Sequence, residues 1–177
     1  MVEIFQKEDK ILRQKSKEVS LKDIKGTKIR KIVADMKEAL DSQEDGVAIA
    51  APQIGELLRI FVISGRVMNI IRGEMKGKVP YPDTVFINPK ITKRSREKML
   101  MEEGCLSARW LYGKVRRSKK VVLGAYDEEG NFFTKGASGL MAQIFQHETD
   151  HLEGILFLDS AIEVEDIPPE KLHQRHV

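Results

Sequence analysis

Two histidines and a glutamate stand at the spacing that binds a metal ion and uses it. The run His147-Glu148-Thr149-Asp150-His151 is an H-E-x-x-H motif. On a helix the imidazoles of residues i and i+4 point the same way, so both histidines can hold one cation while Glu148 lies next to its open coordination position. Such a set activates water and supplies a carboxylate that moves the proton. The motif therefore predicts a metal site that activates water, and it does not by itself settle which reaction follows.

The third metal ligand is not fixed by this motif. One protease class continues as H-E-x-x-H-x-x-G-x-x-H, and this chain follows the pattern through Gly154 but places Phe157, which binds no metal, at the third histidine. Another class uses a downstream glutamate, and three lie in an acidic stretch that we expect at the surface: Glu163, Glu165 and Glu170. The remaining soft ligand is Cys105, although a lone cysteine is more often a small buried hydrophobic residue. The residues alone leave both kinds of ligand open.

The motif needs a helix, and the surrounding residues predict one from about Ser138 to Glu153. Ser138 is a suitable N-cap, and a glycine follows the last turn. Leu140 and Ile144 share one face with the two histidines, and further apolar residues line the adjacent face. A helix that is apolar over both faces is expected to be buried, so its histidines and glutamate need partners.

The other elements follow from hydrophobic spacing. Residues 27–40 carry apolar side chains at steps of three and four, which predicts an amphipathic helix. Strands are predicted at 59–63, 84–87 and 121–126, with a hairpin turn at 127–131 leading into 132–133. The small-residue run 46–55 is predicted to be irregular because it contains a proline. Residues 66–82 are predicted to form a surface loop with a short helix at 67–71.

Length and composition set the frame for these elements. The chain has 177 residues, enough for one domain with a full core, and its charges nearly cancel to +3. Its scattered basic residues predict no sequence-specific nucleic-acid partner. A single cysteine favours a reducing compartment, and we find neither a signal peptide nor a membrane-spanning stretch. We expect one catalytic domain over residues 1–177, with a flexible tail from about 167, in the cytoplasm and without membrane contact.

Three blocks stand in order along the chain: Gly46-Val47-Ala48-Ile49-Ala50-Ala51-Pro52-Gln53, Glu102-Glu103-Gly104-Cys105-Leu106-Ser107 and Gln146-His147-Glu148-Thr149-Asp150-His151-Leu152-Glu153-Gly154. Together they resemble the three signature motifs of the peptide deformylases. Shorter matches at 11–13, 87–89, 139–140 and 156–159 extend the resemblance over nearly the whole chain. Three ordered blocks that share one set of metal ligands are a specific signal, whereas any single block would be weak.

The resemblance implies an α+β fold in which antiparallel or mixed β-sheets surround the buried motif helix. It also implies a mononuclear site in which Cys105, His147 and His151 hold one divalent ion and leave a fourth position for water. Ferrous iron is the common ion of such enzymes, and zinc, nickel or cobalt can replace it. The residues by themselves predict only a borderline-soft divalent metal.

The implied activity removes the formyl group from the N-terminal formyl-methionine of nascent polypeptides and releases formate. Glu148 would take a proton from water at the metal and return it to the departing amine. The side-chain amide of Gln53 and the backbone N–H of Leu106 would stabilise the oxyanion. The backbone groups expected to pair with the extended substrate belong to Gly46, Ala48, Ile49 and Gly104.

Other residues of the blocks have supporting roles or depart from the family pattern. Glu103 is expected to pair with an arginine such as Arg117, while Asp150 either orients a ligand or is solvated on the helix surface. Ala48 replaces the usual second glycine of the first motif, which would crowd the peptide if that position needs a positive φ. After Ser107 a hydrophobic-proline pair becomes Ala108-Arg109, followed by Trp110-Leu111-Tyr112. These departures bear on substrate preference rather than on hydrolysis.

Two other functions stay open at this point. One is a zinc-dependent peptidase with a carboxylate third ligand, and the other is a metal-binding, deformylase-like protein with an altered substrate. A transient ribosome contact would suit an enzyme that acts on nascent chains, although a solvated strand face explains basic residues more often. The basic stretch in question contains Lys114, Arg116, Arg117, Lys119 and Lys120.

Overall fold

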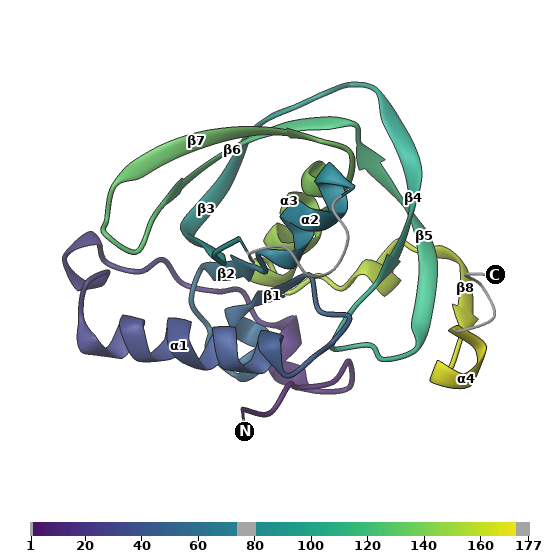
Figure 1. The fold of residues 1–177 in the computed structure, drawn as a ribbon, viewed down its shortest axis with the longest axis horizontal. Coiled ribbons are helices and arrows are strands. Elements are labelled where there is room, and N and C mark those ends of the chain that lie inside the picture. The colour runs from purple at the N-terminus through teal and green to yellow at the C-terminus, as the bar shows by residue number, and fades with distance from the viewer. Residues whose placement is uncertain (1, 74–80, 173–177) are drawn as a thin grey trace.

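A computed structural model describes residues 2–73 and 81–172 of the chain (Figure 1). The helices are α1 (Thr27–Asp41), α2 (Arg66–Arg72), α3 (Gly139–Leu152) and α4 (Pro169–Leu172). The strands are β1 (Ala48–Ala50), β2 (Ile60–Ile63), β3 (Thr84–Arg94), β4 (Lys98–Gly104), β5 (Leu111–Ser118), β6 (Lys120–Tyr126), β7 (Phe132–Ser138) and β8 (Ile162–Asp166). Short 3-10 turns cover Lys10–Arg13, Leu21–Asp23, Ala51–Ile54 and Phe157–Asp159. In the described ranges no helix has the length and apolar character needed to cross a membrane.

The strands form two antiparallel sheets, which confirms the predicted α+β class. A five-stranded sheet has the order β1-β2-β3-β6-β7, and a three-stranded sheet has the order β4-β5-β8. Every pair of neighbouring named strands is antiparallel. The strands β3, β6 and β7 arch over α3, which also contacts β1 and, from the smaller sheet, β5 (Figure 1).

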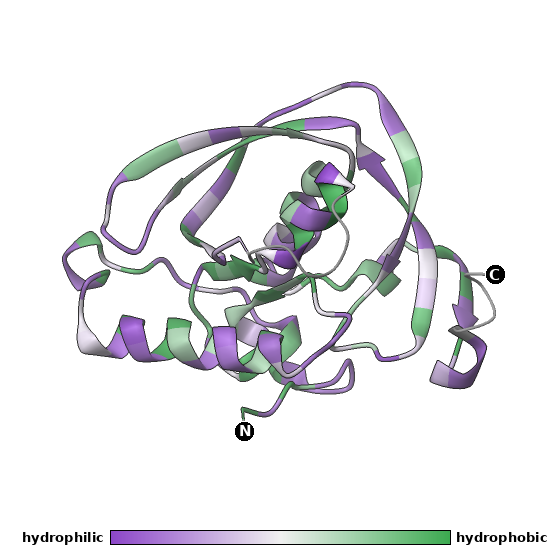
Figure 2. Cartoon of the chain, viewed as in Figure 1, coloured by the Kyte–Doolittle hydropathy of each residue, from purple (hydrophilic) through white to green (hydrophobic). Residues whose placement is uncertain are grey.

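Strand β1 lies between two hydrophobic layers, and its successive side chains contribute to the two layers in turn. The side chain of Ile49 packs into the cluster formed with α1, whereas Ala48 and Ala50 face the cluster formed with α3. Because successive side chains of a strand point to opposite faces, both side chains that face α3 are alanines. Their small size lets the helix approach the strand closely. Figure 2 shows that β1 and β2 are strongly hydrophobic at the centre of the molecule.

Helix α1 covers the other side of this layer with the face that its spacing predicts. Its buried residues are Ile29, Ile32, Val33, Met36, Ala39 and Leu40. Met36 and Leu40 are completely buried, and each such side chain contributes about 1.5–3 kcal/mol of hydrophobic free energy. This layer supports the buried strand β1, which forms part of the first motif block.

Helix α3 follows the hairpin of β6 and β7 and has nearly the predicted bounds. Its N-cap is Ser138, and nine of its 14 residues are buried. After the helix, Gly154 adopts a φ of +76°, and a Cβ there would lie 2.7 Å from the carbonyl of Arg13. The glycine therefore ends the helix in a conformation that other residues rarely adopt and at a contact that excludes a side chain.

Two predicted elements differ from the structure, and a third is confirmed where the structure describes it. The run 46–55 is not wholly irregular, because Ala48–Ala50 forms a strand and Pro52 falls in the turn that follows, where a missing N–H costs little. The short helix predicted at 67–71 within the loop at 66–82 is confirmed as α2, and residues 74–80 lie outside the described residues. The tail expected from residue 167 is ordered at its start, since Ile167 is buried and donates its N–H to the carbonyl of Trp110 at 2.7 Å. Helix α4 follows, and residues 173–177 are outside the described part.

Candidate metal centre and active site

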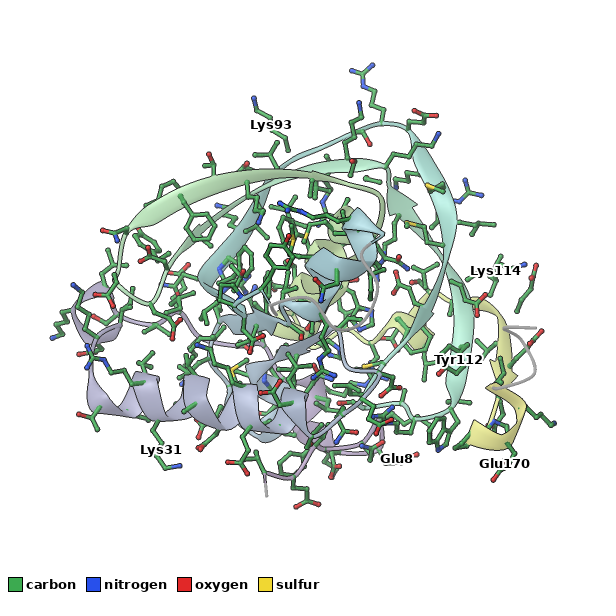
Figure 3. All side chains as sticks on the ribbon, viewed as in Figure 1. Glu8, Lys31, Lys93, Tyr112, Lys114 and Glu170 are labelled. Carbon is green, nitrogen blue, oxygen red and sulfur yellow. The ribbon has the colours of Figure 1, made fainter. Side chains whose placement is uncertain are left out.

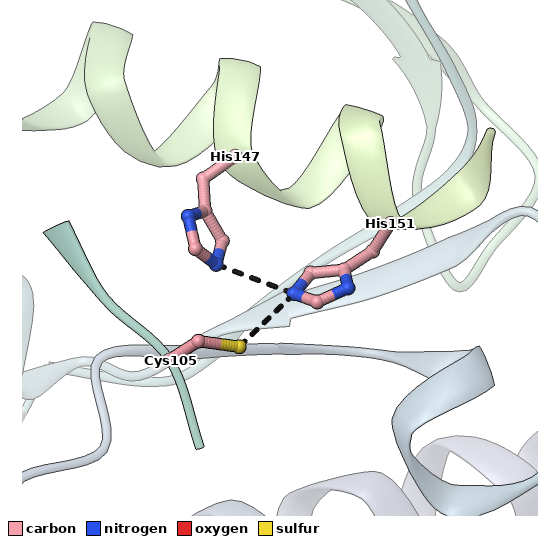
Figure 4. A group of neighbouring side chains, drawn as sticks. All are labelled: Cys105, His147 and His151. Carbon is pink, nitrogen blue, oxygen red and sulfur yellow. Dashed lines mark hydrogen bonds between the residues drawn. The ribbon is translucent and has the colours of Figure 1, made fainter. Parts of the chain in front are cut away.

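Helix α3 and the segment after β4 bring three ligand side chains to one point (Figure 4). The Nε2 atoms of His147 and His151 are 3.2 Å apart, and the Sγ atom of Cys105 lies 3.3 Å from Nε2 of His151. All three ligand atoms lie within 4.8 Å of one another. The soft third ligand of the sequence interpretation is thus in place.

The donors fit a tetrahedral transition metal. Metal–nitrogen bonds of about 2.0–2.1 Å and metal–sulfur bonds of about 2.3 Å put neighbouring tetrahedral ligands about 3.3–3.6 Å apart, close to the observed spacing. Nδ1 of His147 contacts Oε2 of Glu103 at 2.9 Å, so its other nitrogen faces the ligand cluster. A thiolate with two imidazoles suits a borderline divalent ion.

A charged network holds His147 in this orientation. Arg117 donates from Nε and Nη2 to the two carboxylate oxygens of Glu103, at 2.7 and 2.9 Å, which confirms the predicted pair. Its Nη1 donates to Asp150 at 2.5 Å. Asp150 is therefore linked to the ligand His147 indirectly, through Arg117 and Glu103. The exposed fractions of Arg117 and Glu103 are 7% and 2%, so this is a buried pair and not the weak surface pair of the alternative interpretation.

The network shifts the protonation equilibria of the site. Burial raises the pKa of Glu103, but the hydrogen bonds from Arg117 and His147 outweigh it and lower this pKa to about 2. Burial likewise raises the pKa of the Cys105 thiol, while the imidazoles of His151 and His147 hold it well below its usual range. The geometry thus favours the thiolate, which is the form that binds a metal.

Glu148 lies in the buried part of the motif helix with an exposed fraction of 4%. Within the described residues its Oε2 atom has no hydrogen-bond partner, nor does Nδ1 of His151. Burial raises the pKa of Glu148, and the two nearby imidazoles offset this only in part. A buried carboxyl with an unsatisfied oxygen and a raised pKa is suited to exchanging a proton.

Gln53 reaches the ligands from the turn after β1. Its Oε1 accepts the N–H of Ala50 at 2.8 Å, which turns the amide nitrogen toward the sulfur of Cys105, 3.6 Å away. The same nitrogen donates to the hydroxyl of Ser107 at 3.0 Å. Gln53 is 1% exposed, so the amide is held in one orientation with a donor at the ligand cluster.

Leu106 follows the cysteine ligand directly. The N–H of Ser107 donates to Cys105 Sγ at 3.4 Å, and Ala108 donates to the carbonyl of Cys105 at 3.0 Å, so the chain bends around the sulfur. This bend keeps the backbone of Leu106 beside the ligand cluster, and its carbonyl accepts from Gln6 at 3.3 Å.

Strand β1 is the edge strand of the larger sheet. Its pairing with β2 puts Ile49 opposite Val62, and Ser64 donates to Val47, so the backbone groups of Ile49 point into the sheet. Those of Ala48 and Ala50 point to the open edge. The predicted substrate contact of Ile49 is therefore corrected, because its side chain is also fully buried in the core.

The other predicted contact residues have distinct surroundings. Ala48 does not adopt a positive φ, so the replaced glycine costs no backbone strain here. Gly46 is buried, and a Cβ there would lie 2.9 Å from Leu40 Cδ1. Gly104 ends β4 opposite Tyr112, whose ring would lie 2.8 Å from an added Cβ. Both glycines therefore permit close packing of the backbone near the site.

Sequence reasoning missed two residues that position these elements. Ser107 is fully buried and accepts the Gln53 donor, and Gln146 bridges α3 to the backbone N–H and C=O of Ser118, both at 3.0 Å. Both stand inside quoted blocks, but nothing in their spacing identifies a partner.

The remaining carboxylates and basic residues lie away from the ligands or are already paired. Glu163 and Glu165 are exposed on β8, Glu170 is exposed on α4, and none belongs to the ligand cluster found among the described residues. Lys114, which projects from β5 in Figure 3, pairs with Glu163. In the basic stretch Arg117 is buried and Lys119 pairs with Glu97. Most of that stretch thus serves the protein's own contacts.

Comparison with known proteins gives a consistent result. Residues 1–166 match the sequence model of a family described as polypeptide deformylase. Peptide deformylase 2 of Clostridium acetobutylicum is 43% identical over 88% of this chain and 92% of its own length. The peptide deformylase of Dictyoglomus turgidum is 37% identical over 97% of this chain and 99% of its own. The crystal structure of a Synechococcus elongatus peptide deformylase in complex with actinonin superposes with a TM-score of 0.76 at 31% identity, covering 98% of this chain and 82% of the other.

Proposed function

The chain belongs to the peptide deformylase family, and from this premise we propose which of its residues perform the reaction. It is a metal-dependent hydrolase that removes the formyl group from the N-terminal formyl-methionine of nascent polypeptides. Cys105, His147 and His151 hold the ion, and the close approach of their three ligand atoms is the observation that carries this assignment.

The ion bound in the cell is ferrous iron, and zinc, nickel or cobalt also fit a donor set of one thiolate and two imidazoles. When bound, a divalent ion supplies a Lewis acid for the formyl carbonyl and lowers the pKa of a nearby water. The buried Glu103 holds His147 in the tautomer whose Nε2 is free to act as a ligand.

Glu148 moves the proton of the reaction. Water adds its oxygen to the formyl carbon, and Glu148 takes the proton that this addition releases. When the carbon–nitrogen bond breaks, the same carboxyl gives that proton to the departing amine. The products are formate and a free N-terminal methionine, so water is consumed and no other reactant is needed. The raised pKa of the buried Glu148 suits both steps.

Gln53 and Leu106 stabilise the charge that develops on the formyl oxygen. The Gln53 amide is fixed by Ala50 and Ser107 before substrate binds, so its donor requires no reorganisation during the reaction. The backbone N–H of Leu106 is the second donor. Each donor of this kind contributes about 10²–10³-fold in kcat.

The open edge of β1 binds the peptide backbone. Ala48 presents an N–H and a C=O away from β2, and an extended peptide can add to that edge as a further strand. Backbone pairing of this kind is independent of sequence, as a substrate class of many different nascent chains requires.

Formate release from a formyl-Met peptide tests this function, with protein loaded with nickel or, anaerobically, with ferrous iron. Wild type is expected to turn over, and Glu148→Ala is expected to lose about 10²–10⁴-fold in kcat while retaining its metal. Metal bound at one equivalent without formate from wild type would instead identify a metal-binding protein with another substrate.

We also place the enzyme in the cytoplasm, in transient contact with the ribosome. Three basic residues of the stretch 114–120 pair with acidic residues of the chain itself. The other two, Arg116 and Lys120, are exposed and would make the contact with the ribosome. Cosedimentation with ribosomes tests it: salt-sensitive binding that weakens in the double alanine variant is expected, and binding unaffected by that change would remove the idea.

A further inference from the structure

We propose that Arg109 is a positioning residue that sets the spacing between the segment after Cys105 and the loop before β1, where the substrate extends beyond its methionine. This inference rests on the proposed function and concerns substrates longer than formyl-methionine. Its premise is a contact between two segments that both adjoin the active site.

Arg109 joins the segment after the cysteine ligand to the loop before β1. Its Nη1 donates to Asp45 Oδ2 at 2.7 Å, and its Nη2 donates to the side-chain oxygen of Gln43. Arg109 lies three residues after Leu106, and Asp45 lies three residues before Ala48. The bridge therefore connects the segment that contains the oxyanion donor Leu106 to the loop that leads into the peptide-binding strand β1.

The direction of the substrate places this bridge beyond the methionine. Chain direction in β1 runs from Ala48 to Ala50, and Gln53 then reaches the sulfur of Cys105. The formyl group therefore lies toward the end of β1, and the residues after methionine extend back toward Asp45. A strand advances roughly 3.3 Å per residue, and β1 covers only Ala48–Ala50 before the turn that holds Asp45. The bridge therefore lies past the end of β1 that is farther from Gln53, on the side of the residues that follow the methionine.

The backbone around Arg109 holds its guanidinium in this position. Ala108 is 2% exposed and anchors the segment on one side. On the other side Trp110 has a φ of +66°, which non-glycine residues rarely adopt, and its carbonyl accepts from Ile167 at 2.7 Å. The guanidinium lies 5.5 Å from the centre of the Trp110 ring. Contacts on both sides thus orient the arginine toward the loop.

A second arginine keeps the loop folded without Arg109. Arg66 donates to the carbonyls of Gln43 and Glu44 at 2.8 and 3.1 Å and to that of Leu40 at 3.3 Å. These bonds satisfy carbonyls at the end of α1 and fix the loop's backbone. Loss of Arg109 should therefore change the distance between the segment after Cys105 and the loop before β1. The fold and the metal ligands should stay intact.

The test compares substrates of increasing length on the metal-loaded full chain. The substrates are formyl-Met amide, formyl-Met-Ala and formyl-Met-Ala-Ser, and the variants are Arg109→Ala, Arg109→Lys, Asp45→Asn and the double variant Asp45→Asn with Arg109→Ala. Arg109→Ala is expected to raise KM for the tripeptide about tenfold, equal to about 1.4 kcal/mol, with kcat within about twofold. KM for formyl-Met amide should be unchanged, and lysine should restore part of the loss.

Coupling between the two residues gives an independent readout. The double variant should be no worse than Arg109→Ala alone, because both changes remove one interaction. Lys31→Ala is the control, since Lys31 pairs with Asp35 on the outer side of α1 and points away from the body of the protein (Figure 3). It should leave all three substrates unaffected.

The outcomes separate the two levels of the proposal. If Arg109→Ala changes KM equally for all substrates or for none, the positioning role is wrong while deformylation stands. If the effects of the two substitutions simply add, the bridge is not the cause. If metal-loaded wild type releases formate from no substrate, the proposed function fails and this inference fails with it.

Discussion

Glu103→Gln removes the negative charge at the centre of the network that orients His147. The carboxylate of Glu103 accepts two hydrogen bonds from Arg117, and both side chains are buried. Burial raises the pKa of this carboxyl, but the hydrogen bonds from Arg117 and His147 lower it from the ordinary value of 4.5 to about 2. At about 1.4 kcal/mol per unit this difference corresponds to about 3 kcal/mol of free energy of unfolding at neutral pH. Breaking a buried pair by changing one partner typically costs about 3–5 kcal/mol, which agrees in size.

The pH dependence gives this prediction its sign. Because the folded-state pKa of Glu103 is depressed, its contribution is fully present above the unfolded-state pKa near 4.5 and is lost as pH falls toward about 2. The difference in stability between wild type and Glu103→Gln should therefore be largest at pH 5–7 and shrink below about pH 4.

Urea denaturation of the metal-free proteins, followed by circular dichroism at several pH values, measures this difference. Glu97→Gln is the matched control, because Glu97 pairs with Lys119 at the surface, and no measurable change is expected. The same Glu103 variant should bind its metal about 10–100-fold more weakly, since a partner of a ligand is altered. A stability difference that stays constant between pH 7 and pH 3 would refute the electrostatic reasoning.

Three further changes test separate parts of the structure. Cys105→Ser should lose metal during dialysis against a chelator under which wild type keeps it, and retention would favour a carboxylate third ligand. Gln53→Leu should lower kcat by about 10²–10³-fold with metal content unchanged, and an effect on KM alone would remove its oxyanion role. Gly154→Ala should lower the free energy of unfolding by about 2 kcal/mol or more, because φ is +76° and the added Cβ would lie 2.7 Å from a backbone carbonyl. Gly130→Ala, with a similar φ but open space around it, should cost only about 1 kcal/mol in the same denaturation assay, and equal losses would contradict the steric argument.

The sequence predicts the elements whose residues repeat with a clear period. Helices α1 and α3 lie within one or two residues of their expected bounds, because their apolar positions recur at three and four and a serine or glycine marks an end. Strand β4 was not predicted, since Lys98 to Gly104 mixes charged and apolar residues without strict alternation. Its pairing with β5 comes from tertiary contacts that no local pattern records.

Side-chain partners of the site follow a similar division. The two histidine ligands could be predicted from the sequence, because their spacing along one helix suffices to bring them together. Cys105 joins them from 42 residues earlier in the chain, and the resemblance, not the spacing, selected it over the downstream carboxylates. Ile49 was misassigned because the direction of its backbone groups depends on the register with β2, which the sequence does not show.

The contacts around His147 form a closed ring, and this explains why the metal site depends on the three-stranded sheet and the helix at once. His147 binds Glu103 of β4, Glu103 binds Arg117 of β5, and Arg117 binds Asp150, one turn further along α3. A ring that leaves the helix at one residue and returns three residues later fixes both the rotation of α3 and its distance from β4. Because Cys105 follows Glu103 by two residues, the strand that orients one ligand also delivers another. The position of His147 relative to Cys105 is therefore set by a buried ion-pair network of the protein itself.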